Sequence, residues 1–436
     1  MLSDSNNDYI TRLHRLIPGG AHTYSRGDDQ FPSNAPAILE KGKGAYVWDP
    51  RGNKFLDYGM ALRAVTLGYA DEDVNAAAFK GMENGVNLTR ATTVELEAAE
   101  LLSSIIPCAE MVKFAKNGST VTSAAVKLAR AYTGRPLVVF PAEHPFFSYD
   151  DWFIGSTVMD KGVPDEEKKN SLIFHYNDIG SLEKLFSGHP GRIAAVILEP
   201  ATTVGPEDKF LHKVKELCSR NGTVFILDEM ITGFRWDIRG AQAFFDIKPD
   251  LATFGKGMAN GFSVAALAGK KEIMELGGIT KEGAERVFLI STTHGAEMHG
   301  LSAFVKTMEI YRKRDVVAHL WAYGEKLVNG INEISSGLGI KDYFYAEGYP
   351  CSPAYVTKGK DGAPSPGLRT LFSQEMIKNN VLMPYIAISF SHGEKELDIT
   401  LYAVKKALEV YRRALEEGYE KYLSGKVIRP VFRKYN

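Results

Sequence analysis

The chain has 436 residues, of which 44% are hydrophobic and 24% charged, and its 52 basic and 53 acidic side chains leave a formal net charge of −1. This balance excludes a strongly charged disordered chain and argues against a nucleic-acid-binding protein, which would carry a basic excess. The length exceeds what one hydrophobic core usually fills, so we expect two or three structural units.

The cysteines Cys108, Cys218 and Cys351 are widely spaced and form no C-x-x-C pair. The sequence therefore predicts neither a disulfide framework nor a cysteine zinc site. The first residues lack the pattern of a secretory signal, and no apolar run reaches the ~20 residues that span a bilayer. We expect a cytoplasmic globular protein with no membrane segment.

The first 65 residues are rich in turn-forming residues and contain one hairpin pattern. Two short apolar runs, 46–48 and 55–57, flank a turn at residues 49–53. We predict that the segment 1–65 packs with a small domain formed by the C-terminal part of the chain.

Residues 66–325 are predicted to form a large α/β domain. Short apolar runs alternate here with helical patterns, which indicates a mainly parallel, seven-stranded sheet with helices on both faces. The last two runs are joined by a short connection, which predicts one antiparallel strand. The seven runs are residues 112–115, 137–140, 171–174, 195–198, 223–227, 251–254 and 264–267.

The C-terminal region, residues 326–436, is predicted to be a small α+β domain. A long helical pattern over residues 304–338 leads into it. Weak strand patterns follow at 343–345 and 354–356, and a second long helical pattern covers 394–418.

A predicted helix start carries the first of three polar motifs that close apolar runs. Gly118, Ser119 and Thr120 follow the run 112–115, and the exposed N–H groups of a helix start favour an anion. The alternative is an ordinary N-cap, for which Ser and Thr are common.

Two further motifs close the runs 223–227 and 251–254. Asp228 and Glu229 are either solvated acids at a strand end, or one of them provides a carboxylate that pairs with a cationic ring nitrogen. Lys256 lies between two glycines and is either a solvated loop lysine or an amine for Schiff-base chemistry. An anion cradle, a carboxylate and an amine are the three groups that pyridoxal 5′-phosphate (PLP) needs from a protein.

The run LDEMITGFR, followed 28 residues after Asp228 by Lys256 in PDLATFGKGMANG, resembles class III (subgroup II) PLP-dependent aminotransferases of fold type I. Within this family the chain is most similar to glutamate-1-semialdehyde 2,1-aminomutases, over nearly its whole length. The resemblance implies a homodimer with shared active sites.

The same resemblance implies roles for single residues. Lys256 matches the Schiff-base lysine, and Asp228 matches the partner of the pyridine nitrogen. Gly118, Ser119 and Thr120 match the turn that binds the phosphate group. A second set of matches lies beside the phosphate or the substrate. Thr292 matches a threonine that reaches the phosphate from the neighbouring subunit, and Thr23 and Arg26 fall near the substrate carboxylate.

Two stretches depart from the family pattern. The family's Tyr-His-Gly is replaced by residues 143–147, so the ring that stacks on PLP is either His144 or Phe146. The family's Ser-Gly-Asn-Pro is replaced by residues 294–297, which places His294 on the substrate side. The spacing of His294, Glu297 and His299 differs from that of a zinc helix, so we predict no metal site.

These observations predict a PLP-dependent aminotransferase. It would move an amino group from a small-molecule donor to an aldehyde or keto acceptor through a Lys256 Schiff base, in two ping-pong half-reactions. The alternative is the intramolecular transfer of an aminomutase. A PLP-dependent decarboxylase or racemase and a non-catalytic relative are weaker alternatives.

Overall fold

The structure is a computed structural model that describes residues 5–436, so the first four residues of the predicted N-terminal segment lie outside the described part. The chain divides into two compact units. The first combines residues 5–71 with Ala318–Arg433, and the second contains Glu72–Val317. The domain limits 1–65, 66–325 and 326–436 stay sequence predictions.

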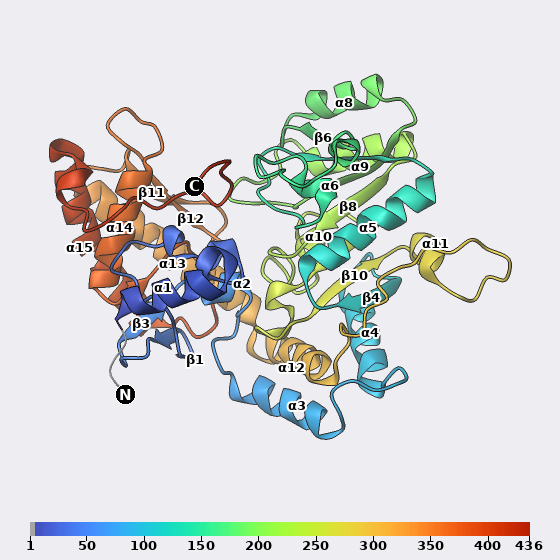
Figure 1. Cartoon of the computed structure of the whole chain (residues 1–436), viewed down its shortest axis with the longest axis horizontal. Coiled ribbons are helices and arrows are strands. Elements are labelled where there is room, and N and C mark those ends of the chain that lie inside the picture. The colour runs from blue at the N-terminus through green and yellow to red at the C-terminus, as the bar shows by residue number, and fades with distance from the viewer. Residues whose placement is uncertain (1–4) are drawn as a thin grey trace. The chain divides into compact units, whose positions relative to one another are not determined.

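The second unit is built on a seven-stranded sheet with the strand order β4-β10-β9-β8-β7-β5-β6 (Figure 1). Only β10 runs antiparallel to its neighbours, so the predicted α/β architecture with a single antiparallel strand is confirmed. The strands are β4 (Met111–Ala115), β5 (Leu137–Pro141), β6 (Ser171–Phe174), β7 (Ile193–Leu198), β8 (Val224–Asp228), β9 (Leu251–Phe254) and β10 (Ala265–Gly269).

Helices cover both faces of this sheet, which explains why its strands are apolar at consecutive positions. Phe225 and Leu227 of β8 pack in one core with α8 (Ile179–Gly188) and α9 (Phe210–Arg220). Val224 and Ile226 are also buried and point to the opposite face, on which α5 (Gly118–Thr133) crosses the central strands.

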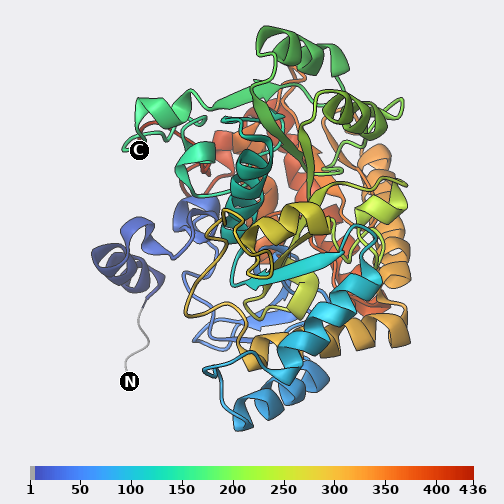
Figure 2. The same ribbon diagram turned by 90° about the vertical axis from the view of Figure 1, so that its right-hand side faces the viewer.

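The remaining helices of this unit lie outside that core. In Figures 1 and 2, α12 packs against α3 and α4. The helices are α3 (Glu72–Glu83), α4 (Thr93–Ile105), α6 (Asp151–Ile154), α7 (Asp165–Lys168), α10 (Ala241–Phe244), α11 (Lys271–Met274) and α12 (Met298–Arg314).

The long helical stretch predicted over residues 304–338 is two helices in the structure. The first, α12, ends at Asp315, which adopts the left-handed conformation (φ 48°) and donates its N–H to the carbonyl of Tyr311. The second, α13 (Val316–Gly337), begins directly afterwards. Aspartate tolerates this backbone conformation better than most residues, and apolar periodicity alone does not reveal the break.

The first unit contains the predicted hairpin, in which β2 (Tyr46–Trp48) pairs antiparallel with β3 (Lys54–Asp57). A four-stranded sheet extends it in the order β1-β2-β3-β13, and β11 and β12 pair separately. The other elements of the unit are β1 (Lys41–Lys43), β11 (Phe344–Glu347), β12 (Ala354–Thr357), β13 (Val381–Leu382), α1 (Asn6–Leu16), α2 (Met60–Arg63), α14 (Pro366–Lys378) and α15 (Glu394–Glu417).

None of the helices in residues 5–436 combines the length and the apolar character that crossing a membrane requires.

Candidate active site

The sequence predicts an anion-binding helix start at Gly118, and the structure begins α5 there, with Asn117 and not Ser or Thr as the cap. Asn117 is the N-cap, and its Oδ1 accepts hydrogen bonds from the backbone N of Thr120 (3.0 Å) and from the Thr120 hydroxyl (3.1 Å). Ser119 is buried and accepts a hydrogen bond from the N–H of Tyr149 (3.1 Å). The remaining N–H groups of the first turn, at Gly118 and Ser119, have no acceptor within the helix.

Met230 connects this helix start to the loop that carries Lys256. A Cβ atom on Gly118 would approach the Met230 sulfur to 2.9 Å, and one on Gly255 would approach the same sulfur to 2.7 Å. A side chain at either position would therefore require the Met230 thioether to move.

Asp228 ends β8 and is almost fully buried. Its Oδ1 accepts hydrogen bonds from the backbone N of Met230 (3.0 Å) and from the Thr253 hydroxyl (3.0 Å). Burial raises the pKa of Asp228 to about 6, although these hydrogen bonds and the charge of Lys256 oppose the rise. The carboxylate is therefore ionised at neutral pH and keeps Oδ2 available.

Glu229 has a different role from its neighbour. Its fully buried carboxylate accepts hydrogen bonds from the N–H groups of Ala241 and Gln242 at the start of α10. It also accepts from the side chains of Thr232 (3.2 Å) and Gln242 (2.9 Å). Burial raises the pKa of Glu229 to about 7. This carboxylate holds a turn together and is neither the solvated acid nor the ring partner that the sequence allowed.

Lys256 follows the end of β9, the strand next to β8, and its backbone is in the left-handed region (φ 45°). A non-glycine residue held in this conformation is strained, and such strain is concentrated at functional sites. The charge of Lys256 acts on Asp228, so the predicted amine and carboxylate lie within electrostatic reach of each other.

His144 and Phe146, the two candidates for the stacking ring, lie in different environments. His144 is buried, and its Nδ1 accepts a hydrogen bond from the backbone N of Glu199 (3.0 Å) at the carboxyl end of β7. Burial lowers its pKa to about 4, so the ring is neutral. Phe146 is 46% exposed and contacts Phe153 edge-on. His144 is thus anchored at the sheet end, whereas Phe146 is partly exposed.

Thr292 and His294 lie on an exposed segment that precedes α12. The Thr292 hydroxyl donates to the carbonyl of His294 (2.5 Å). The carboxylate of Glu297 is 3.3 Å from His294 Nδ1 and accepts from Lys116 Nζ (2.6 Å). Residues 294–297, which replace the family's Ser-Gly-Asn-Pro, therefore contact Lys116 through Glu297. Lys116 directly precedes Asn117, the N-cap of α5. Among residues 5–436, no group of three or more potential ligands is arranged to hold a metal ion.

The remaining two candidates, Thr23 and Arg26, belong to the first unit. Thr23 is half-buried and precedes a short 3-10 helix that ends at Arg26. Arg26 is exposed and lines a cavity of that unit.

The residues at the sheet end fit PLP. A helix start with free N–H groups suits a phosphate, Asp228 suits a protonated ring nitrogen, and Lys256 supplies an amine. Nε2 of His144 is buried and has no hydrogen-bond partner in the described part of the chain, so a bound group with an acceptor would satisfy it. Sequence reasoning gave no role to Thr253, Met230 and Glu199, although Met230 lies in LDEMITGFR and Thr253 in PDLATFGKGMANG. The available signal for Thr253 was a threonine inside the apolar run 251–254.

The fold and this site define a PLP-dependent enzyme of fold type I. The family model of class-III aminotransferases matches residues 28–342. The chain belongs to the class-III aminotransferase family, and its cofactor is PLP.

Individual relatives agree with this assignment. The chain is 31% identical to a 3-aminobutyryl-CoA aminotransferase of Cloacimonas acidaminovorans, over 92% of this chain and 96% of that one. It is 32% identical to a glutamate-1-semialdehyde 2,1-aminomutase of Alkaliphilus oremlandii, over 94% and 99% of the two chains. Among solved structures, the PLP internal aldimine form of the Sphingopyxis sp. MTA144 FumI protein is similar with a TM-score of 0.86 and 25% identity, covering 94% of this chain and 97% of that one.

Proposed function

We propose that this protein is an aminotransferase that moves an amino group from an external amino donor to an aldehyde or keto acceptor. The observation that carries the proposal is the position of a buried, ionised Asp228 and of Lys256 at the ends of neighbouring strands. Both hydrogen bonds that Asp228 accepts end on Oδ1. The carboxylate is therefore fixed in place while Oδ2 is left for a cationic ring nitrogen.

Each residue would have a defined role. Lys256 would hold PLP through its ε-amine and then carry a proton at Nζ between the reacting atoms. Asp228 would keep the ring nitrogen protonated. When bound, PLP supplies an electron sink for the substrate's reacting carbon. Gly118, Ser119 and Thr120 would hold the phosphate at the start of α5.

We infer that His144 is the ring that stacks on PLP. Its contact with Glu199 places it at the carboxyl end of β7, which is the neighbour of β8. Phe146 lacks this anchor and faces solvent. A neutral imidazole adds no charge to the ring system beneath it.

The substrate side supports two versions of the reaction. Thr23 and Arg26 would bind a substrate carboxylate, for which a guanidinium is suited, and His294 would lie near the entrance. The aminomutase relatives keep intramolecular transfer as the second candidate. The replacement of Ser-Gly-Asn-Pro by residues 294–297 favours transfer from an external donor.

We further propose a homodimer in which Thr292 reaches the phosphate in the partner subunit. The exposed positions of Thr292 and of nearby Phe288, which is 74% exposed, support an interface along this segment. The three cysteines are buried and unpaired, which suits the reducing cytoplasm.

The visible spectrum of the PLP-loaded protein, recorded before and after excess L-glutamate without an acceptor, tests the reaction. Loss of the band of lysine-bound PLP together with release of 2-oxoglutarate is expected. A spectrum that changes with glutamate-1-semialdehyde but not with glutamate or other amino donors would favour the aminomutase. Absence of any such band after PLP is added would overturn the proposal.

A further inference from the structure

The chain continues beyond its last long helix. After α15 and a short 3-10 turn, residues 424–433 form neither helix nor strand. We call residues 424–433 the C-terminal strap. The N–H and the hydroxyl of Ser424 donate to Gln374 Oε1 (2.8 and 2.7 Å), and the N–H of Ile428 donates to the Thr370 hydroxyl (3.0 Å). Thr370 and Gln374 are buried and lie one turn apart on α14, so the strap is fixed along one face of this helix.

The strap also holds a loop near the start of the chain. The N–H of Arg429 donates to the carbonyl of Asp29 (3.0 Å), and the carbonyl of Arg429 accepts from the Gln30 side chain (2.9 Å). Arg433 Nη2 forms an ion pair with Asp29 Oδ2 (2.5 Å), while Arg433 Nη1 donates to the carbonyl of Pro430 within the strap (2.9 Å). The strap therefore joins Asp29 and Gln30 to α14.

The loop that the strap holds carries Thr23 and Arg26. It contains three single 3-10 turns, which are η1 (Pro18–Gly20), η2 (Tyr24–Arg26) and η3 (Asp28–Gln30). Turns this short do not fix their orientation relative to one another. Contacts from outside the loop therefore hold it in place: His14 of α1 contacts Asp28 (2.7 Å), and the strap binds the next two residues.

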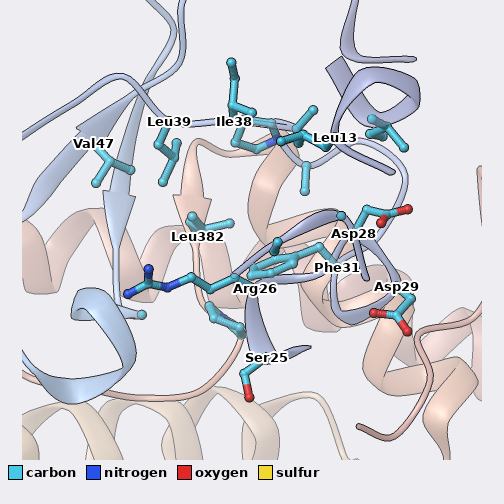
Figure 3. A pocket seen from close by; sticks show the side chains of 18 of the residues that line it. Leu13, Ser25, Arg26, Asp28, Asp29, Phe31, Ile38, Leu39, Val47 and Leu382 are labelled. Carbon is cyan, nitrogen blue, oxygen red and sulfur yellow. The ribbon is translucent and has the colours of Figure 1, made fainter. Parts of the chain in front are cut away.

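Asp29 connects the strap to the backbone beside Arg26. The Oδ1 atom of Asp29 accepts from the Gln30 side chain (3.1 Å) and lies against Gly27, where a Cβ atom would approach it to 2.9 Å. Gly27 directly follows Arg26 in the chain. Figure 3 shows Arg26 and Asp29 on this loop, with the Arg26 side chain extending away from Asp29 along the cavity lining. The contact between Asp29 and Arg433 therefore acts on the part of the loop next to Arg26.

We propose that the C-terminal strap positions Thr23 and Arg26 for substrate binding, and that Arg433 is a positioning residue that acts through Asp29. This inference rests on the proposed substrate role of Thr23 and Arg26. A loop that is already held in place loses less conformational entropy when a substrate binds, so the substrate binds more tightly. The residues proposed to hold PLP belong to the second unit, so loss of the strap should weaken substrate binding and leave PLP binding unchanged.

Hydrogen exchange of the PLP-loaded protein tests whether the strap holds the loop. The amides of residues 20–31 should exchange severalfold faster in Arg433→Gln and about tenfold faster in a chain that ends at Gly425. Asp29→Asn combined with Arg433→Gln should exchange like Arg433→Gln alone, because both changes remove the same contact. Arg412→Gln, which removes an exposed arginine of α15, is the matched control and should exchange like the parent.

Titration of the same proteins with glutarate, an unreactive dicarboxylate, tests the effect on substrate binding. Arg26→Gln should weaken glutarate binding about tenfold, because it removes a charge-assisted contact. Arg433→Gln should weaken glutarate binding severalfold and leave PLP affinity unchanged, and Arg433→Lys should restore part of the glutarate affinity. In the reaction with L-glutamate, Arg433→Gln should raise the half-saturating concentration severalfold and leave the limiting rate unchanged.

The two measurements separate failure of the strap from failure of the proposed function. Equal exchange of residues 20–31 in the parent, Arg433→Gln and the shortened chain would overturn the role of the strap. Faster exchange with unchanged glutarate affinity in Arg433→Gln would overturn it too, because the strap would then stabilise the loop without serving the substrate. If the parent binds no glutarate, or Arg26→Gln binds it like the parent, the substrate role of Arg26 fails and the role of the strap fails with it. A parent that binds PLP and glutarate but transfers no amino group would contradict the proposed aminotransferase and leave the role of the strap standing.

Discussion

The Thr253 hydroxyl donates a 3.0 Å hydrogen bond to Oδ1 of Asp228, joining the ends of two neighbouring strands. This bond stabilises the ionised carboxylate at a position where burial disfavours it. Asp228 therefore carries its charge at neutral pH at an energetic cost to the protein without cofactor. A cationic ring beside Oδ2 would offset that cost.

The substitution Asp228→Asn should consequently have opposite effects on the two forms of the protein. The pKa of Asp228 is raised from 3.8 to about 6 in the folded chain, so the native state binds the extra proton and loses stability as the pH rises through this window. At pH 7.5 the PLP-free variant should be more stable than the parent by on the order of 1 kcal/mol. PLP retention, measured by dialysis and absorbance, should fall at least tenfold.

Thr253→Val is the variant to compare with Asp228→Asn. It removes one hydrogen bond to Oδ1 and keeps the charge, so it should raise the pKa of Asp228 further and weaken PLP binding less than Asp228→Asn does. Equal PLP affinity of the parent and Asp228→Asn proteins would remove Asp228 from the cofactor site.

The left-handed backbone of Lys256 leads to a second prediction. Lys256→Ala should abolish the visible band of lysine-bound PLP and the turnover, while PLP still binds non-covalently. Lys256→Gly should lose the same functions but be more stable than Lys256→Ala by about 1 kcal/mol, because glycine adopts positive φ without strain. Denaturant midpoints of the two PLP-free variants measure this difference.

Lys213→Ala is the control, since Lys213 is an exposed residue of α9. It should keep the band, the turnover and the stability of the parent. A Lys256→Ala protein that retains turnover would show that another amine holds the cofactor.

The buried ring of His144 gives a pH-dependent prediction. Its pKa is lowered from 6.5 to about 4, so the unfolded chain binds the extra proton and stability is lost as the pH falls from 6.5 to 4. The loss attributable to this residue is about 3 kcal/mol. In His144→Phe that loss of stability disappears, but the N–H of Glu199 loses its imidazole acceptor at every pH, at a cost of about 1–3 kcal/mol.

The variant should therefore be less stable than the parent at pH 7.5, and the difference should shrink or reverse at pH 5. Urea midpoints at both pH values measure it, with His189→Phe as the control on a half-buried histidine of the same unit. If the stability difference between His144→Phe and the parent is the same at both pH values, His144 has the same pKa in the folded and the unfolded chain.

The strand pattern of the second unit was readable from the sequence for a physical reason. Strands covered on both faces, such as 195–198 and 251–254, need apolar residues at every position, and this requirement appears directly in the sequence. The hairpin around residues 49–53 was readable from its turn residues. The break at Asp315 was not, because apolar spacing continues across it and only the backbone conformation changes.

The sequence predicts a site residue's role where the residue type itself determines the chemistry. It predicts the role less well where that role depends on contacts with other parts of the chain. Asp228 and Lys256 carry the motif. The different roles of Asp228 and Glu229 depend on the N–H groups at the start of α10, which lie 12 and 13 residues after Glu229. The contrast between His144 and Phe146 depends on the backbone N–H of Glu199, the residue that follows β7. Neither contact leaves a signal in a single sequence.

The link between Glu297 and Lys116 gives the last prediction. Glu297 directly precedes α12 and is almost fully buried. Its carboxylate accepts hydrogen bonds from Lys116 Nζ (2.6 Å) and from the N–H of Gly295 (2.9 Å). Burial alone would raise its pKa, but the contact with Lys116, together with backbone hydrogen bonds, lowers the pKa below its usual value. The pair therefore stabilises the protein at neutral pH, and this contribution is lost as the pH falls below 4.5.

Glu297→Gln should lower the free energy of unfolding by about 1 kcal/mol at pH 7.5 and by almost nothing at pH 4. The loss at pH 7.5 is small because Lys116 is partly exposed. Since Lys116 precedes the cap of α5, the variant should also bind PLP severalfold more weakly in a spectroscopic titration. Glu216→Gln, on the exposed face of α9 with only a 3.9 Å contact to Arg220, is the control and should change neither quantity. If Glu297→Gln weakens folding but leaves PLP affinity unchanged, the substituted stretch 294–297 stabilises the unit without positioning the phosphate turn.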